Sequence, residues 1–515
     1  MSGMRSRPTR GAGEESAVDV RGSQRGSTAT APLGATTGRE RLALGTLLAT
    51  AAAQYAWNAW TVPPLTGYDA PGHAAYVLTL VETGRLPHPT SGWSTFHPPL
   101  WYLLAAGIWK LVDPLGPRAV VAGMRAIGAV AWLGAGAVAF SLARRLGASP
   151  AAALVGAALV LFVPCAQLAA VMEGNEALAA ALAAAALPFV VTLAGDPGAR
   201  RAALAAGLLA GLALATKFTG LFVALACAVP FLRPRLGPRA RGALALALLV
   251  GGLAAGPTYL RNLALLGTPF PMTRTRDPMR SVEAGFELRP RKVADYLTID
   301  LGVLVRPSLF QLPPGPRPPR RSPLAPPLNP AMTSVPGLTY AGAWYDALGH
   351  RLPLPVLRRG SPAGPVLLLL GLVPTLLAAA GALGAAREAV RRRLCSPDAP
   401  LVVMSLVGVA SYVGFTWTVP SLAAAKCSYL LPLAVPAAVF FARAMDALPR
   451  GLRVPALVFS AAAAGVAALV FTQGLVFPGR PLEPPELEAW RSWGSQLPGS
   501  RIGDAVSALI RPGGG

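Results

Sequence analysis

The sequence predicts an all-α integral membrane protein, and three observations lead to that class. The chain of 515 residues is 53% hydrophobic and only 13% charged, whereas a soluble domain is roughly 25% charged. Apolar stretches recur at lengths near the ~20 residues that a helix needs to cross the hydrocarbon core of a bilayer. Arginines recur in alternate short connections between those stretches, as they do at the cytoplasmic ends of membrane helices.

The apolar stretches predict about eleven transmembrane helices, and the first is longer than a signal-peptide core, so we interpret it as a retained anchor. They cover residues 42–62, 118–142, 150–171, 177–194, 202–216, 218–232, 242–260, 363–383, 400–419, 428–445 and 454–475. Arginines follow every second span, at Arg144/Arg145, Arg200/Arg201, Arg233 to Arg241, Arg387 to Arg393 and Arg450/Arg453. This alternation predicts a cytoplasmic N-terminus and an outer C-terminus.

The apolar segment 97–112 is short for a crossing, at about 15 residues. Counting it as a span would invert the arginine alternation, so we predict a helix that lies in the outer interface, where Trp101, Tyr102 and Trp109 are favoured. Residues 63–117 then form one continuous outer loop.

The same patterns predict the domain organisation. We expect a disordered cytoplasmic tail (1–41), an N-terminal membrane module (42–262), a large Pro-rich outer loop (263–362), C-terminal membrane helices (363–475) and an outer tail (476–515). Polar composition predicts the disorder of the first segment. Residues 313–330 are expected to be extended, because proline dominates them, and residues 483–493 to form a short helix.

The net charge of +23 does not indicate a nucleic-acid partner. Lysine occurs at only four positions, so nearly all of the excess is arginine, and no block of basic and aromatic residues suggests strand binding. Basic loops beside membrane spans explain the charge. The four cysteines show no metal-ligand spacing, and a disulfide framework is not expected in such a chain.

The stretch "TGYDAPGH" opens the predicted outer loop and draws attention to function. Asp69, His73 and Tyr76 lie at i, i+4 and i+7, so in a helix they share one face. One interpretation is an aspartate that caps the helix, with a histidine at the surface. The other is a reactive site, since this loop holds three of the four histidines, at 73, 88 and 97.

The loop resembles the first outer loop of GT-C-type glycosyltransferases, a superfamily that includes protein O-mannosyltransferases and the lipid A aminoarabinose transferase. The resemblance runs through "YDAPGHAAYVLTLVETGRLP", "FHPPLWYLLAAGIW", "ARRLGAS", "EGNEALAAALAA", "GLALATKFTGL", "GPTYLRNLALLGTPF", "YAGAWYD" and "KCSYLLPLAVPA", in order, over most of residues 42–446. It implies that Asp69 is the catalytic base or a metal-associated acid. The family usually places a second acid directly after this aspartate, but here Ala70 follows.

The resemblance also suggests roles for two glutamates and for several basic and aromatic side chains. Glu173 and Glu176 are candidate second acids that orient the acceptor or bind a metal; the alternative is a solvated turn. The candidate substrate-binding residues are His73, His97, Lys217, Arg261, Tyr345 and Lys426. The cations fall at outer ends of spans, where they would stabilise a leaving lipid phosphate or snorkel to the interface. Tyr345 would stack on a sugar or belong to an interfacial aromatic belt.

These features favour an inverting hexosyl or pentosyl transferase of the plasma membrane, with its active site facing outside. Its donor would be a polyprenyl-phosphate-linked sugar, and its acceptor a glycan, a lipid or a protein. No cofactor is certain; a divalent cation stays open, with oxygen ligands from Glu173 or Glu176. The alternatives are a multi-span transporter or lipid-linked-sugar flippase, which would carry broken or charged helices near mid-membrane, and a non-catalytic membrane assembly protein.

Overall fold

The protein is helical throughout the part of the chain that the structure describes. This computed structural model describes residues 37–92, 94–196, 199–229, 237–271, 290–299, 333–345, 362–420 and 424–476, and these ranges hold no strands. The helices are α1 (Gly38–Thr61), α2 (Ala70–Thr83), α3 (Leu100–Val112), α4 (Pro117–Arg145), α5 (Pro150–Phe162), α6 (Pro164–Ala170), α7 (Glu176–Gly195), α8 (Arg200–Thr216), α9 (Leu221–Ala226), α10 (Pro238–Leu266), α13 (Ala294–Leu297), α16 (Val335–Trp344), α18 (Ala363–Arg391), α19 (Ala399–Thr418), α20 (Ala434–Ala447) and α21 (Arg450–Val470), with 3-10 helices η1 (Asp113–Leu115), η2 (Phe218–Gly220) and η6 (Cys427–Leu433). The predicted all-α membrane class is confirmed.

The predicted count of eleven spans is not confirmed. Among the described residues seven helices are long and apolar enough to cross a membrane, or up to eight if the bent pair α5 and α6 forms one span. Helix α8 has only 17 residues. Of the span expected over 218–232, the structure describes residues 218–229, and these hold η2 and the six-residue α9. The chain leaves helical geometry at Lys217, between α8 and η2.

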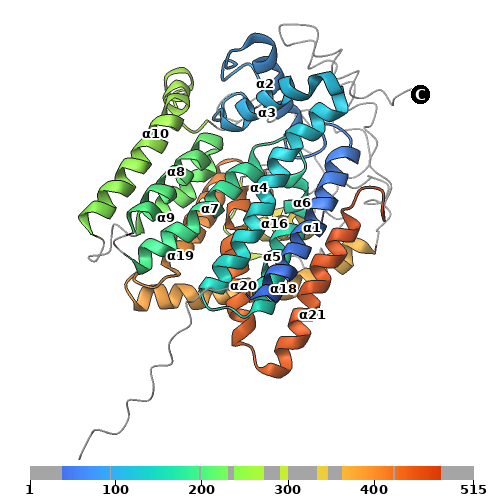
Figure 1. Cartoon of the computed structure of the whole chain (residues 1–515), viewed down its shortest axis with the longest axis vertical. Helices are drawn as coiled ribbons and strands as arrows, with labels where there is room; N and C mark the ends of the chain where they lie inside the picture. The colour runs from blue at the N-terminus through green and yellow to red at the C-terminus, as the bar shows by residue number, and fades with distance from the viewer. Residues whose placement is uncertain are drawn as a thin grey trace, which may run out of the picture.

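Helices such as α1, α4 and α10 run between a lower and an upper end of the bundle (Figure 1). At the lower end, Arg144 in the last turn of α4 pairs with Glu40 in the first turn of α1 at 3.3 Å. Arg145 donates to the Thr192 hydroxyl of α7 at 2.7 Å. The upper end carries α2, α3 and the start of α4, and we call it the site end.

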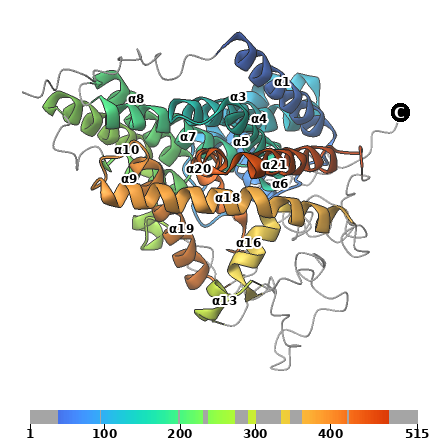
Figure 2. The same cartoon turned by 90° about the horizontal axis from the view of Figure 1, so that it is seen from below.

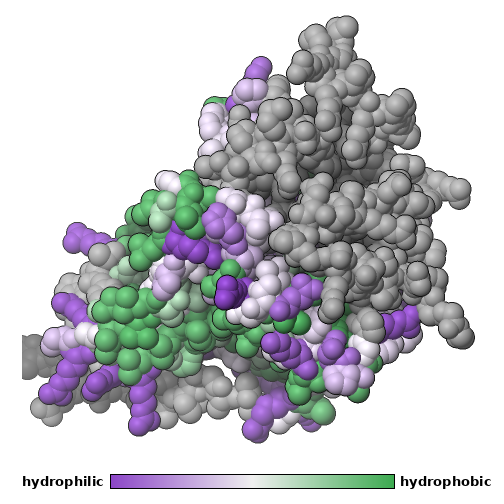
Figure 3. Space-filling model, turned by 90° about the horizontal axis from the view of Figure 1, so that it is seen from above, coloured by the Kyte–Doolittle hydropathy of each residue, from purple (hydrophilic) through white to green (hydrophobic). Residues whose placement is uncertain are grey.

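The first outer loop predicted at 63–117 holds α2 and α3. These two helices form a small core of their own with the start of α4, in which Tyr76, Trp101, Tyr102 and Met124 are buried. Hydrophilic and hydrophobic side chains lie interspersed on the described part of this end (Figure 3). The loop is therefore an ordered cap on the bundle.

Small residues allow close helix packing elsewhere. A Cβ on Gly211 of α8 would overlap the backbone of Gly251 of α10, the kind of contact by which membrane helices approach closely. Figure 2 shows α18 crossing the bundle, with α16 and α13 on the side away from α1. These two short helices belong to the predicted outer loop 263–362; its Pro-rich stretch 313–330 and the expected helix 483–493 lie outside the described residues.

Candidate active site

Asp69 directly precedes α2 in a left-handed backbone conformation with φ 55°, a region that aspartate adopts more readily than most residues. The chain reaches it through Gly67, at φ 137°, where a Cβ would lie 2.8 Å from the Met172 side chain. Asp69 forms no side-chain cap. Its carboxylate lies 2.9 Å from the Lys426 Nζ, so the interpretation as a capping aspartate is wrong.

The Asp69–Lys426 pair joins two distant segments at the site end. Lys426 precedes η6 with an extended backbone, and its side chain is 7% exposed against 28% for that of Asp69. Burial raises the pKa of Asp69, but the positive charge of Lys426 outweighs it and holds this pKa below its ordinary value. Burial lowers the pKa of Lys426, and the Asp69 charge more than reverses that effect.

A second lysine–carboxylate pair lies at two other helix ends. Glu176 is the first residue of α7, where the helix dipole favours a carboxylate. Its Oε1 lies 2.5 Å from the Nζ of Lys217, which stands at the break between α8 and η2. The Asn175 side chain donates to the Thr216 carbonyl at 3.2 Å and ties the two turns together. Lys217 is buried.

His73 links the two pairs. It follows Asp69 by one turn of α2, and its Nε2 lies 3.8 Å from the Glu176 Oε2. Its Nδ1 shares a hydrogen bond of 2.7 Å with the Tyr102 hydroxyl, and its ring stacks on His97 at 5.7 Å between centroids. Burial lowers the pKa of His73 despite the nearby Glu176 charge, which favours the neutral ring at neutral pH. We call Asp69, His73, Glu176, Lys217 and Lys426 the lysine cluster.

Glu173 lies outside this cluster, against the guanidinium of Arg125. The Arg125 Nη2 is 3.1 Å from the Glu173 Oε1, and both side chains are fully buried. The guanidinium also donates to three backbone carbonyls, those of Ala59, Val62 and Pro63. The Glu173 carboxylate accepts from the Leu65 amide at 3.3 Å. Both glutamates are buried, so the interpretation as a solvated turn is wrong.

The remaining predicted site residues have bracing or core positions. Arg261, in α10, donates to the backbone carbonyls of Pro87 and Thr95 at 3.2 and 3.1 Å and holds the first outer loop against that helix. Tyr345 ends α16 and is 2% exposed. The structure thus brings together Asp69, His73, His97, Glu176, Lys217 and Lys426, and assigns Arg261 and Tyr345 contacts within the fold.

Sequence reasoning missed several residues of the site. Arg118 begins the predicted span 118–142, but Arg125 lies within it among apolar residues, and an arginine at membrane depth is itself a signal of a buried partner. Tyr102 and Tyr429 gave no such signal; Tyr429 lies under the Lys217 ammonium at 5.6 Å.

The expectation against a disulfide is also wrong. Cys165 and Cys427 form one, with their Cα atoms 6.8 Å apart and a sequence separation of 262. Two cysteines in separate apolar segments carry no spacing signal, and only the fold brings them together.

A divalent cation finds no ready ligand set here. No three His, Cys, Asp or Glu side chains gather as a metal site within the residues that the structure describes. The Asp69, Glu173 and Glu176 carboxylates each face a lysine or arginine instead. The donor set does not fit a hard cation, which requires several oxygen ligands at once, and we derive no step through a metal.

Comparisons with known proteins give the fold a name. No family model matches the chain, and no curated protein matches it by sequence. Among solved structures, the Archaeoglobus fulgidus oligosaccharyltransferase tethered to an acceptor peptide is similar over 92% of this chain and 59% of its own, at 15% identity and a TM-score of 0.50. This chain therefore spans less than two thirds of that relative.

Two further glycosyltransferases are similar at lower scores. ArnT from Cupriavidus metallidurans bound to undecaprenyl phosphate matches over 84% of this chain and 78% of its own, at 18% identity and a TM-score of 0.37. The Saccharomyces cerevisiae O-mannosyltransferase Pmt1–Pmt2 complex bound to its sugar donor matches over 55% and 38%, at 18% identity and a TM-score of 0.31. The chain has the fold of the GT-C glycosyltransferases, as the sequence resemblance predicted.

Proposed function

We propose that this chain, with its GT-C fold, is a membrane glycosyltransferase that moves a sugar from a polyprenyl-phosphate carrier to an acceptor hydroxyl on the outer face of the plasma membrane. The observation that carries the proposal is the pairing of Asp69 with Lys426, beside the pairing of Glu176 with Lys217, at adjoining helix ends. A carboxylate next to two buried ammonium groups suits a reaction that removes a proton and releases a phosphate.

Each group has a defined part in the transfer. The Asp69 carboxylate accepts the proton of the acceptor hydroxyl as its oxygen attacks the anomeric carbon. The bond between that carbon and the phosphate oxygen breaks on the opposite face, so the configuration inverts. Lys217 and Lys426 stabilise the negative charge of the departing polyprenyl phosphate. Glu176 holds Lys217 in place at 2.5 Å, and the His73 ring lies 3.8 Å from the other oxygen of Glu176.

The resting ion pair explains how the base is made ready. A carboxylate whose pKa Lys426 keeps low is a weak base. A donor phosphate that binds Lys426 withdraws part of that charge from Asp69, and the pKa of Asp69 then rises toward the working pH. Donor binding therefore precedes productive acceptor binding. This order keeps Asp69 from reacting before the donor is present.

Two observations support the outer orientation. The arginines at the lower end of the bundle follow the pattern of cytoplasmic connections. The Cys165–Cys427 disulfide lies beside the lysine cluster, and disulfides persist in oxidising compartments outside the cytoplasm. The acceptor and the sugar are set by the shape of the bound site rather than by these charges.

The test is Asp69→Asn in membranes supplied with a labelled polyprenyl-phosphate sugar. We expect transfer to fall by about 10²- to 10⁴-fold, the usual worth of a general base, with normal amounts of folded protein. Asp113→Asn is the matched control, because Asp113 lies exposed in the same loop. Equal transfer by wild type and Asp69→Asn would remove Asp69 from the mechanism.

A flippase is the second candidate, and the break between α5 and α6 favours it. These helices meet at 58°, and broken helices are common in transporters. In sealed proteoliposomes a flippase would move the lipid-linked sugar across the bilayer without an acceptor. Translocation that persists in Asp69→Asn, together with no transfer in either protein, would favour this function over the enzyme.

A further inference from the structure

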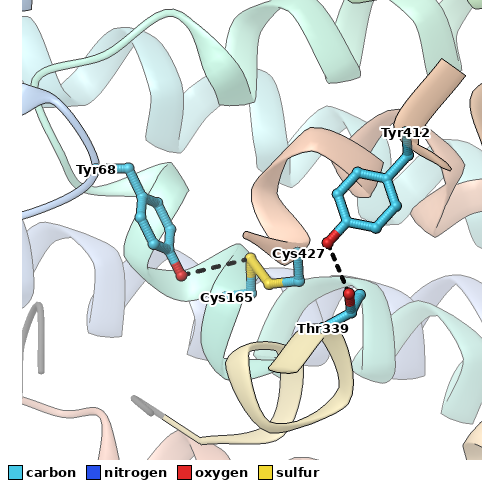
Figure 4. Close-up of a disulfide and its surroundings, with 5 residues drawn as sticks. All are labelled: Tyr68, Cys165, Thr339, Tyr412 and Cys427. Atoms are coloured by element: carbon cyan, nitrogen blue, oxygen red, sulfur yellow. Dashed lines mark hydrogen bonds between the residues drawn. A yellow bond between two sulfur atoms is a disulfide. The ribbon is translucent and has the colours of Figure 1, made fainter. Parts of the chain in front are cut away.

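The residues that flank Asp69 and Lys426 are themselves joined. Cys427 follows Lys426 directly and is bonded to Cys165 of α6. Tyr68 precedes Asp69, and its hydroxyl points at the Cys165 Sγ from 3.9 Å (Figure 4). The path from Asp69 through Tyr68, Cys165, Cys427 and Lys426 therefore closes on itself through the Asp69–Lys426 ion pair.

Tyr68 strengthens this closed path with a second contact. The Lys426 ammonium lies 5.6 Å from the centroid of the Tyr68 ring, within the range of a cation–π interaction. Tyr68 thus contacts the sulfur through its hydroxyl and the lysine through its ring. One side chain therefore contacts both the disulfide and the ion pair.

The disulfide lies where the two membrane modules meet. Cys165 belongs to the N-terminal module and Cys427 to the C-terminal helices, and both are buried. Helix α16 of the outer loop packs over them, and a Cβ on Gly342 would lie 3.9 Å from the Cys427 Sγ. Beside it Thr339 and Tyr412 share a hydrogen bond of 2.6 Å between their hydroxyls (Figure 4). Asp69 and Lys426 divide between the same two modules, so the crosslink fixes the distance across which they pair.

We propose that the Cys165–Cys427 disulfide, with Tyr68, positions Lys426 against Asp69, so that opening the disulfide loosens the ion pair. The cysteines and Tyr68 are positioning residues, and they do not touch the reacting atoms. The consequence for catalysis rests on the proposed glycosyltransferase function. The geometric claim does not, and it is tested without any donor.

The first measurement establishes the state of the cysteines. Maleimide labelling of the denatured, unreduced protein should modify Cys227 and Cys395 only, because these are the free cysteines. After treatment with a phosphine, which takes up oxygen from water while the disulfide gains two electrons and two protons, all four should react. Four reactive cysteines in protein that was never reduced would overturn the proposal.

The second measurement reads the ion pair through lysine chemistry. The chain has only four lysines, so acetylation of each by an amine-reactive ester can be followed by peptide mass spectrometry. In Cys165→Ala/Cys427→Ala we expect Lys426 to acetylate about fivefold faster, the effect of removing roughly 1 kcal/mol of pairing. The exposed Lys110 and Lys292 should be unchanged, and Asp69→Asn should show the largest rise at Lys426.

Matched variants separate positioning from general loss of structure. Cys227→Ala removes a buried free cysteine and should leave the Lys426 rate at the wild-type value. Tyr68→Phe keeps the disulfide and the ring but loses the hydroxyl, and should give a smaller rise. If the double alanine variant does not fold, phosphine treatment of the folded wild-type protein replaces it.

The outcomes are separable from those of the transfer assay. An unchanged Lys426 rate after the disulfide is opened would overturn the positioning role even if the protein transfers sugar. Faster acetylation of Lys426 in a protein that transfers no sugar would support the positioning role and contradict only the proposed function. If both hold, the opened protein should also lose transfer and shift the acid side of its pH profile upward.

Discussion

Two ion pairs at the site end differ in their burial and in what surrounds them. Arg125 and Glu173 are fully buried, and their polar atoms also bond to backbone groups at the end of α1. Asp69 and Lys426 lie at helix ends, and the Asp69 side chain keeps 28% of its surface exposed. We call the first pair the arginine clamp; the lysine cluster contains the second.

This difference indicates which of the two pairs can exchange its carboxylate for a substrate phosphate. A guanidinium has a rigid fork of donors, whereas an ammonium is a point charge on a flexible stem. The arginine clamp uses its fork to hold the backbone that leads to Asp69, so an incoming phosphate would have to break several bonds at once. A lysine can turn from a carboxylate to a phosphate while keeping its charge satisfied. We infer a structural role for the arginine clamp and a substrate role for the lysine cluster.

The largest effect is expected for Arg125→Met. Removing one partner of a buried pair leaves an uncompensated charge and costs about 3–5 kcal/mol. We expect little folded protein and a lower thermal unfolding temperature in detergent. Arg144→Met is the matched control, since its pair with Glu40 is partly exposed and worth roughly 0–1 kcal/mol. A stable but inactive Arg125→Met would instead move the clamp into the catalytic machinery.

Lys217→Met should act on transfer rather than on folding to the same degree. The variant loses one of two cations at the proposed phosphate site, and we expect kcat to fall about 10²-fold. Glu176 then lacks its partner, so some loss of stability accompanies the change. Steady-state kinetics with varied donor give the measurement, and Lys110→Met, an exposed lysine of α3, is the control. A variant with wild-type kcat would restrict Lys217 to a structural role.

Lys426→Met should change the pH dependence of transfer. In the wild type the pKa of Asp69 is lowered below 3.8, so the base stays ionised, and the pair adds stability that is lost only as pH falls below that value. Without Lys426, burial raises this pKa, and the acid limb of kcat/KM moves toward neutral pH by about one unit or more. The measurement is the pH profile of kcat/KM between about pH 5 and 8, compared between the wild type and Lys426→Met. An unmoved acid limb would mean that Asp69 is not the titrating base.

Sequence patterns predicted the fold class and the spacing of Asp69 and His73 for physical reasons. Apolar length and arginine alternation respond to the bilayer, which acts on every span alike. Asp69 and His73 could be placed one helical turn apart because α-helical spacing is regular; Asp69 itself precedes α2, and its carbonyl accepts from the His73 amide at 3.2 Å.

The pairings could not be predicted, because they depend on tertiary contacts between distant segments. Nothing in sequence tells that Lys426 meets Asp69 while Glu173 meets Arg125. The span count is not confirmed for a related reason. An apolar run such as 218–232 has the composition of a crossing helix, but within its described part, 218–229, the α-helix covers Leu221–Ala226.

The smallest effect is expected for Tyr102→Phe. This change removes the hydroxyl that lies 2.7 Å from the His73 Nδ1, a hydrogen bond worth about 1 kcal/mol. Because the His73 ring lies 3.8 Å from the Glu176 Oε2, and Glu176 pairs with Lys217, we expect part of that loss to appear as a few-fold lower kcat, with the donor KM little changed.

Tyr55→Phe is the control that sharpens this last comparison. Tyr55 is equally buried and donates to the Leu161 carbonyl, away from the lysine cluster. Both variants should lose similar thermal stability, but only Tyr102→Phe should lose kcat. If both variants lose kcat alike, the hydrogen bond between Tyr102 and His73 supports the fold alone. His73 would then have no part in transfer.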